Sequence, residues 1–192
     1  MRRVSKSWKY RIGRLAEKCA FEATCQIVYS SLRSEPENLS LDSGDLIRTY
    51  RKPNNEDDWV VWWHQPSRHH SYRKKVSDLP DVVVYRNHQP IVAIEVKNWN
   101  PRDKINSYQL VKEMVKRFLS VPNTIPCVVL SSSTNFRRPE QCLSILRDSH
   151  IEIRLFRHRP LRNTDLKETT TEMRQILEPN ITPERLMGQT LS

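Results

Sequence analysis

Residues 79–97 read LPDVVVYRNHQPIVAIEVK, and this stretch decides the fold of the chain. β-Branched and aromatic side chains dominate 82–85, and a second apolar run follows at 91–96. The residues between the two runs, 86–90, are polar and end in proline, which is typical of a tight connection between strands. The sequence therefore predicts an antiparallel hairpin at the centre of a sheet.

The register of this hairpin predicts a pair of facing carboxylates. If the turn is centred on His88, Asp81 and Glu95 lie equally far from it and face each other across the two strands. Side chains alternate along a strand, so Glu95 and Lys97 share one face. Two facing carboxylates repel unless a cation or a proton compensates. Mg²⁺, which binds through one or two carboxylates and keeps several waters, is the expected cation, with Lys97 beside it.

Pro80-Asp81, followed by Glu95-Val96-Lys97 at the end of an apolar strand, resembles the motif of the PD-(D/E)XK nuclease superfamily. That superfamily includes restriction endonucleases and archaeal Holliday-junction resolvases. The resemblance implies an α/β fold with a restriction-endonuclease-like α-β-β-β-α-β core, in which helices flank a mixed central sheet. It also implies Mg²⁺-dependent hydrolysis of DNA phosphodiester bonds, with Mn²⁺ as a substitute metal. Asp81, Glu95 and the backbone carbonyl of Val96 would hold the metal, and Lys97 would orient the attacking water.

The N-terminal part of the chain predicts a long helix over residues 7–32, with apolar side chains on two sides. Its pattern Gly13-x-x-x-Glu17 resembles the first helix of the resolvases, whose glutamate reaches the metal. This resemblance implies that Glu17 is a further catalytic and metal-binding residue. Glu22, which borders the other apolar stripe, is the rival candidate.

Basic and amide side chains near the hairpin are the candidates for DNA contact. Segment 65–78 is rich in basic residues and runs directly into Pro80-Asp81, which favours contact with phosphates. A helix is expected from about residue 106 to 120, and the superfamily resemblance implies that this helix supplies further contacts. The alternative for all of these residues is an ordinary solvated surface. The candidates are Arg68, Arg73, Lys74, Lys75, Gln109 and Lys112.

The remaining segments complete an α/β order. The expected elements are a loop at 34–44, an extra hairpin formed by strands at 45–52 and 59–64, strands at 126–130 and 151–156, and helices at 139–148 and 164–178. We expect a nuclease-like domain over 1–160, and a C-terminal helix and tail over 161–192. Three tryptophans crowd the extra hairpin, where a sheet core or a homodimer surface is favoured over base stacking. They are Trp59, Trp62 and Trp63.

Composition limits the partners and the compartment. The 192 residues carry 32 Lys+Arg against 22 Asp+Glu, a net charge of +10 that favours a polyanion such as double-stranded or branched DNA. The four cysteines form no C-x-x-C pair, which argues against structural zinc and is consistent with a reducing interior. With no signal peptide or transmembrane segment expected, we predict a cytoplasmic protein without a membrane partner. The alternative function is a non-catalytic, nucleic-acid-binding module in which Glu95 and Lys97 form a structural ion pair.

Overall fold

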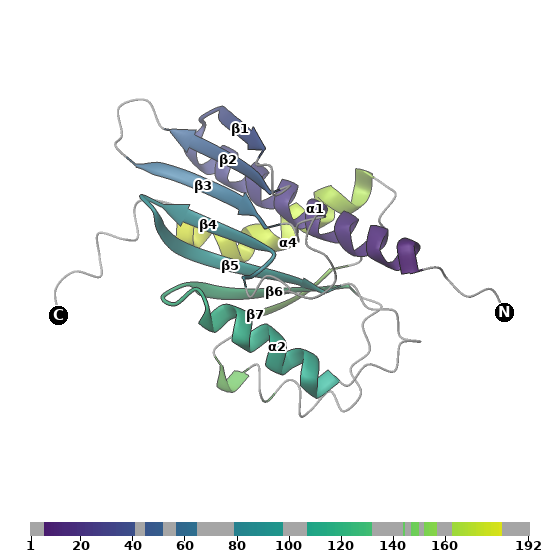
Figure 1. Ribbon diagram of the computed structural model, residues 1–192. Coiled ribbons are helices and arrows are strands. Elements are labelled where there is room, and N and C mark those ends of the chain that lie inside the picture. Colours follow the sequence, from purple (N-terminus) through teal and green to yellow (C-terminus); the bar gives the residue numbers. More distant parts are fainter. Residues whose placement is uncertain are drawn as a thin grey trace, which may run out of the picture.

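The computed structural model describes residues 6–40, 45–51, 57–64, 79–97, 107–131, 144, 147–149, 152–156 and 163–181. These residues form an α/β structure in which helices pack on a single sheet (Figure 1). The helices are α1 (Lys6–Leu32), α2 (Ser107–Leu119) and α4 (Asn163–Ile181). The strands are β1 (Pro36–Ser40), β2 (Leu46–Arg51), β3 (Asp58–Trp63), β4 (Val82–Arg86), β5 (Gln89–Lys97), β6 (Ile125–Ser131) and β7 (Glu152–Phe156).

The sheet is mixed, as the sequence predicts. Its seven strands follow one another in chain order. Strands β1 to β5 pair antiparallel, whereas β5, β6 and β7 are parallel. Helix α2 supplies the crossover that a parallel β5–β6 pair requires.

The main core lies between the sheet and helices α1 and α4, which run behind it in Figure 1. Alternate residues of the central strands, among them Trp63, Val82 and Ile94, are buried in this core. From α4, Leu177 and Ile181 are completely buried in the same core. The C-terminal helix is therefore an integral part of the hydrophobic core that α1 and the sheet build.

On the opposite face of the sheet, α2 lies at the end formed by β6 and β7 (Figure 1). Val111 and Met114 of this helix are fully buried, as are Val83 and Ala93, which alternate with the residues of the main core. Since Glu95 alternates with Ile94 and Val96, its side chain points to the α2 side. Glu95 therefore lies on the α2 side of the sheet, at the end of the hairpin where the candidate site forms.

The central hairpin has the predicted register, but its turn is not the one expected, which was centred on His88. Asn87 and His88 both have positive φ, 51° and 66°, as a two-residue hairpin turn of type I′ requires. The turn is thus centred between these residues, and Arg86 pairs with Gln89. The register then shifts beyond Tyr85, so that Val83 faces Ala93 as expected. A β-bulge restores the register that carries Asp81 toward Glu95.

Two local expectations are wrong. The segment expected as a loop at 34–44 contains strand β1, whose polar sequence PENLS has no alternating pattern but pairs with β2 along its whole length. The C-terminal helix runs past its expected end at 178, through Pro179 to Ile181. Burial of Ile181 favours this extra turn despite the hydrogen bond that proline removes. The helix expected at 139–148 lies mostly outside the described residues.

Candidate active site

Three polar residues occupy neighbouring positions on adjacent strands. His64, at the end of β3, donates its backbone N–H to the carbonyl of Asp81 at 3.0 Å. Asp81 precedes β4, and the register of β4 and β5 puts it opposite Glu95. The N–H of Val96 donates to Oδ2 of Asp81 at 2.8 Å. The Asp81 carboxylate is therefore anchored directly on the strand that carries Glu95.

Glu95 is completely buried, although it is a carboxylate. Its Oε1 accepts hydrogen bonds from Lys97 Nζ and from Nη1 of Arg117. Its Oε2 is also buried, and none of the described residues donates a hydrogen bond to it. Burial, together with the negative charge of Asp81, raises the pKa of Glu95 to about 7, against the opposing effect of Lys97 and Arg117.

Arg117 of α2 is a site residue that the sequence prediction missed. Its Nη1 contacts Glu95 and lies 3.7 Å from Oδ1 of Asp81. Of the two DNA-contact candidates on this helix, Lys112 is exposed to solvent, and the side chain of Gln109 lies outside what the structure describes. The sequence offered one indication of this role, because Arg117 precedes Phe118 and so borders the buried stripe of α2.

Glu17 of α1 comes within electrostatic range of this group. Burial, followed by the charge of Asp81, raises the pKa of Glu17 to about 7, while Arg14 and Lys97 act in the opposite direction. Arg14 Nη1 lies 3.9 Å from Oε2 of Glu17, which is too far for a hydrogen bond. Oε2 is buried and accepts no hydrogen bond from the described part of the chain.

Glu22, the rival candidate, is engaged elsewhere. Its two carboxylate oxygens accept from Nη1 and Nη2 of Arg48 at 2.6 and 3.1 Å, a bidentate pair between α1 and β2. The structure therefore brings Glu17, and not Glu22, toward Asp81 and Lys97.

Gly13, one turn before Glu17, has open space around it. A Cβ added there would meet no described atom within 4 Å beyond the neighbours along the helix itself. Close packing inside the described structure is therefore not the reason for a glycine at this position.

The donor set fits a metal that takes few protein ligands. Asp81 and Glu95 supply two carboxylates, and buried oxygens of Glu95 and Glu17 have no hydrogen-bond partner in the described ranges. Mg²⁺ needs only one or two carboxylates and completes its shell with water. Among the described residues, no three His, Cys, Asp or Glu side chains form a ready-made metal group. A metal at this site would therefore have a solvent-rich shell and would meet a Glu95 that is already paired with Lys97 and Arg117.

His64 belongs to a second polar cluster, which the sequence analysis did not identify. Trp62 Nε1 donates to Oδ2 of Asp45 at 3.0 Å, and His64 Nδ1 lies 3.6 Å from the same oxygen. The His64 and Trp62 rings stack with centroids 4.7 Å apart. Burial lowers the pKa of His64, although Asp45 and Asp81 oppose this effect. The cluster places the His64 imidazole next to the Asp81 backbone, and burial favours its neutral form.

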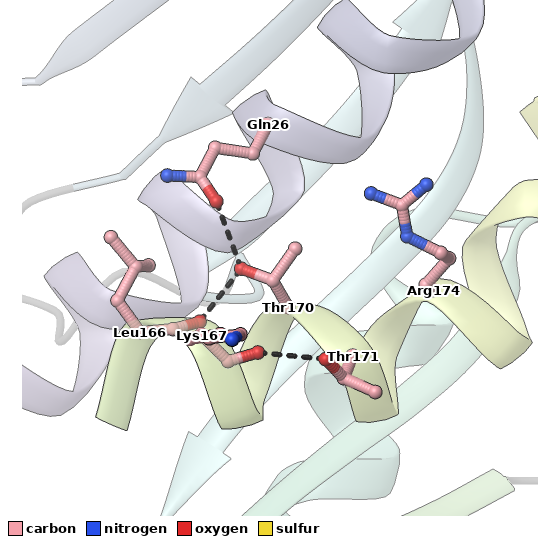
Figure 2. Close-up of a pocket in the computed structure, with 6 residues that line it drawn as sticks. All are labelled: Gln26, Leu166, Lys167, Thr170, Thr171 and Arg174. Carbon is pink, nitrogen blue, oxygen red and sulfur yellow. Dashed lines mark hydrogen bonds between the residues drawn. The ribbon is translucent and has the colours of Figure 1, made fainter. Parts of the chain in front are cut away.

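A cavity of about 410 Å³ between α1 and α4 involves none of the candidate residues (Figure 2). Thr170 Oγ1 lies 2.7 Å from the carbonyl of Leu166 on its own helix and 3.1 Å from Gln26 Oε1 of α1, and its single hydroxyl proton can be donated to either acceptor. The lining of the cavity consists of Gln26, Leu166, Lys167, Thr170, Thr171 and Arg174. The pocket is a feature of helix packing and contains no carboxylate.

The predicted DNA contacts Arg68, Arg73, Lys74 and Lys75 lie outside the described residues. No described helix is long and apolar enough to cross a membrane. No family model and no curated protein matches this chain. Its function therefore has to be argued from the carboxylates, lysine and arginine that meet at the end of the central hairpin.

Proposed function

We propose that this chain is a metal-dependent DNA endonuclease of the PD-(D/E)XK type, which hydrolyses phosphodiester bonds. The observation that carries the proposal is the meeting of Asp81, Glu95 and Lys97 on one face of the β4–β5 hairpin, with Glu17 in electrostatic range. Burying two carboxylates side by side costs stability, and the raised pKa of Glu95 reports that cost. A metal-binding role explains why the chain retains them.

Each residue has a distinct role in this proposal. Mg²⁺, when bound, supplies Lewis acidity and lowers the pKa of a coordinated water. Asp81 and Glu95 would hold the cation, and the Val96 N–H, which donates to Oδ2, fixes the Asp81 carboxylate in place. Lys97 offsets negative charge at the reacting phosphate. Glu17 binds the metal directly or through water.

The proposed partner is DNA, bound by its phosphates. The net charge of +10 supports a polyanionic partner. In the sequence, segment 68–75 lies shortly before Pro80-Asp81, so its basic residues remain our proposed phosphate contacts. Trp59 and Trp63 are buried in the core, which leaves half-buried Trp62 as the tryptophan available to the proposed homodimer surface.

One observation favours a second candidate, a non-catalytic, nucleic-acid-binding module. Lys97 and Arg117 together neutralise Glu95, so the charges at this site are balanced without a metal. In such a protein the buried carboxylate would have a purely structural role.

Cleavage assays distinguish the two candidates. Linear, nicked, flapped and branched DNA are incubated with Mg²⁺ or Mn²⁺, and with EDTA as the metal-free control. Asp81→Ala, Glu95→Ala and Lys97→Ala should each abolish metal-dependent cleavage, while DNA affinity stays close to that of the wild type. Asp58→Ala, which removes a partly exposed carboxylate paired with Arg51, is the matched control and should cut normally. DNA binding without cleavage in either metal would favour the binding module, and normal cutting by all three variants would refute the site.

A further inference from the structure

Arg117 sits between the two carboxylates that would hold a metal. The buried residues Met114 and Phe118 fix α2 against the sheet and bring Arg117, beside this stripe, to the end of the hairpin. Its side chain is only 18% exposed. The same nitrogen, Nη1, contacts Glu95 Oε1 and lies 3.7 Å from Asp81 Oδ1. One positive charge therefore faces both carboxylates at once.

A divalent cation that bridges these carboxylates needs the same space. Oδ2 of Asp81 already accepts the Val96 N–H, so Oδ1, the oxygen that faces Arg117, would be the more open of the two for a metal. Two cations at a few ångströms repel strongly in a buried site, where the effective dielectric constant is low. Arg117 and a bridging metal therefore exclude each other from the position between Oδ1 and Oε1.

We propose that Arg117 is an internal counter-cation, which joins Asp81 to Glu95 in the metal-free protein and leaves them when a divalent cation binds. This inference rests on the proposed metal-dependent function. Oε2 of Glu95 accepts no hydrogen bond from the described residues, so it would be open to coordination once Arg117 has left. The metal affinity of the wild-type protein is then held down by the free energy of the arginine–carboxylate contacts.

Binding of Mn²⁺, followed by electron paramagnetic resonance, tests the competition without any measurement of cleavage. The titrations use wild type, Arg117→Ala and the control Arg51→Ala, in which an arginine is removed from its 3.0 Å pair with Asp58 on an exposed strand position. They are run above pH 7, where Glu95 is ionised. A charged hydrogen bond corresponds to about tenfold or more in affinity, so Arg117→Ala should bind Mn²⁺ at least about tenfold more tightly than wild type. Arg51→Ala should match wild type.

The outcomes separate this inference from the proposed function. Equal Mn²⁺ affinity in wild type and Arg117→Ala would overturn the inference and leave the metal-dependent function standing. No Mn²⁺ binding by any of the proteins would overturn both.

A second measurement uses the wild-type protein and does not depend on the folding of Arg117→Ala. The Nε–H resonance of Arg117, assigned by its absence from Arg117→Lys, is followed by ¹⁵N NMR during titration with Mg²⁺. Displacement predicts that this resonance shifts and loses its protection from solvent exchange. A resonance that stays unchanged at saturating Mg²⁺ would overturn the inference.

Discussion

Val96 donates its backbone N–H to Oδ2 of Asp81 at 2.8 Å, which ties the carboxylate that precedes β4 to the backbone of β5. Val96, which donates this bond, lies between Glu95 and Lys97 in the sequence. Asp81 therefore holds the hairpin end together in addition to its proposed role as a metal ligand. Substitutions that keep or remove this bond can separate the two roles.

Asp81→Asn and Asp81→Ala should differ in stability but not in activity. Asparagine keeps a side-chain oxygen for the Val96 N–H, whereas alanine leaves that donor unpaired, at a cost of about 1–3 kcal/mol in free energy of unfolding. Both variants lose the negative charge that the metal requires, so both should lose Mg²⁺-dependent cleavage. Urea unfolding and a plasmid-cleavage assay measure the two effects. Equal stability of the two variants would contradict the structural role of the bond.

Glu17→Gln and Glu22→Gln form a matched pair on one helix. Glu17→Gln should lower cleavage by about 10–100-fold, as the loss of a metal-supporting group typically does. Glu22→Gln should cut within about twofold of wild type. It should also lower the free energy of unfolding by about 1 kcal/mol, because its charged, bidentate pair with half-buried Arg48 is weakened. The assignment of Glu17 to the site fails if the two variants cleave alike.

The raised pKa of Glu95 predicts how stability changes with pH in the metal-free protein. The pKa is raised from 4.5 to about 7, so between these values the folded protein binds a proton that the unfolded chain releases. The contribution of Glu95 therefore destabilises the fold progressively as pH rises from 4.5 to about 7, and is constant above that range. Glu95→Gln removes this contribution, which amounts to at most about 3 kcal/mol above pH 7.

The measurement is urea unfolding in EDTA at several pH values across this range, for wild type and Glu95→Gln. Burial lowers the pKa of His64, which contributes a slope of the opposite sign to both proteins. The difference between the two proteins therefore isolates Glu95. A difference that does not change with pH would show that the carboxyl group titrates normally.

Gly13→Ala should stabilise the protein. Glycine in a helix interior costs about 0.5–1 kcal/mol relative to alanine, and no described atom outside the local helix would obstruct the added Cβ. Thermal or urea unfolding should show an increase of that size. A decrease in stability would mean that the position needs glycine for its backbone or for a contact.

The sequence predicted the hairpin and its facing carboxylates because both depend on local rules. Alternation and turn residues place Asp81 opposite Glu95. The β-bulge beyond Tyr85 could not be predicted, since nothing in residues 86–91 distinguishes a three-residue turn from a two-residue turn followed by an extra residue. Strand β1 was missed for a related reason, because its pairing partner β2, and not its own polar sequence, makes it a strand.

Helix α2 marks the limit of sequence reasoning about the site. Its apolar stripe was predictable from the spacing of residues such as Met114 and Phe118. The stripe, however, has two flanks, and the flank that meets the carboxylates depends on how the β5–α2–β6 crossover rotates the helix on the sheet. That rotation is a tertiary property, so Arg117 reached the site while Lys112 remained exposed.

The packing of α1 on α4 has a consequence for the order in which the chain can fold during synthesis. Residues of α1 such as Ala20 and Ile27 share one core with Leu177 and Ile181, although more than a hundred residues separate the two helices in sequence. A ribosome releases α4 after the sheet and the other described helices, so the apolar surface of α1 stays uncovered by its partner until α4 has emerged. A fragment that stops at residue 160 would retain the Asp81–Lys97 hairpin but expose this surface permanently. Such a fragment would be prone to aggregation.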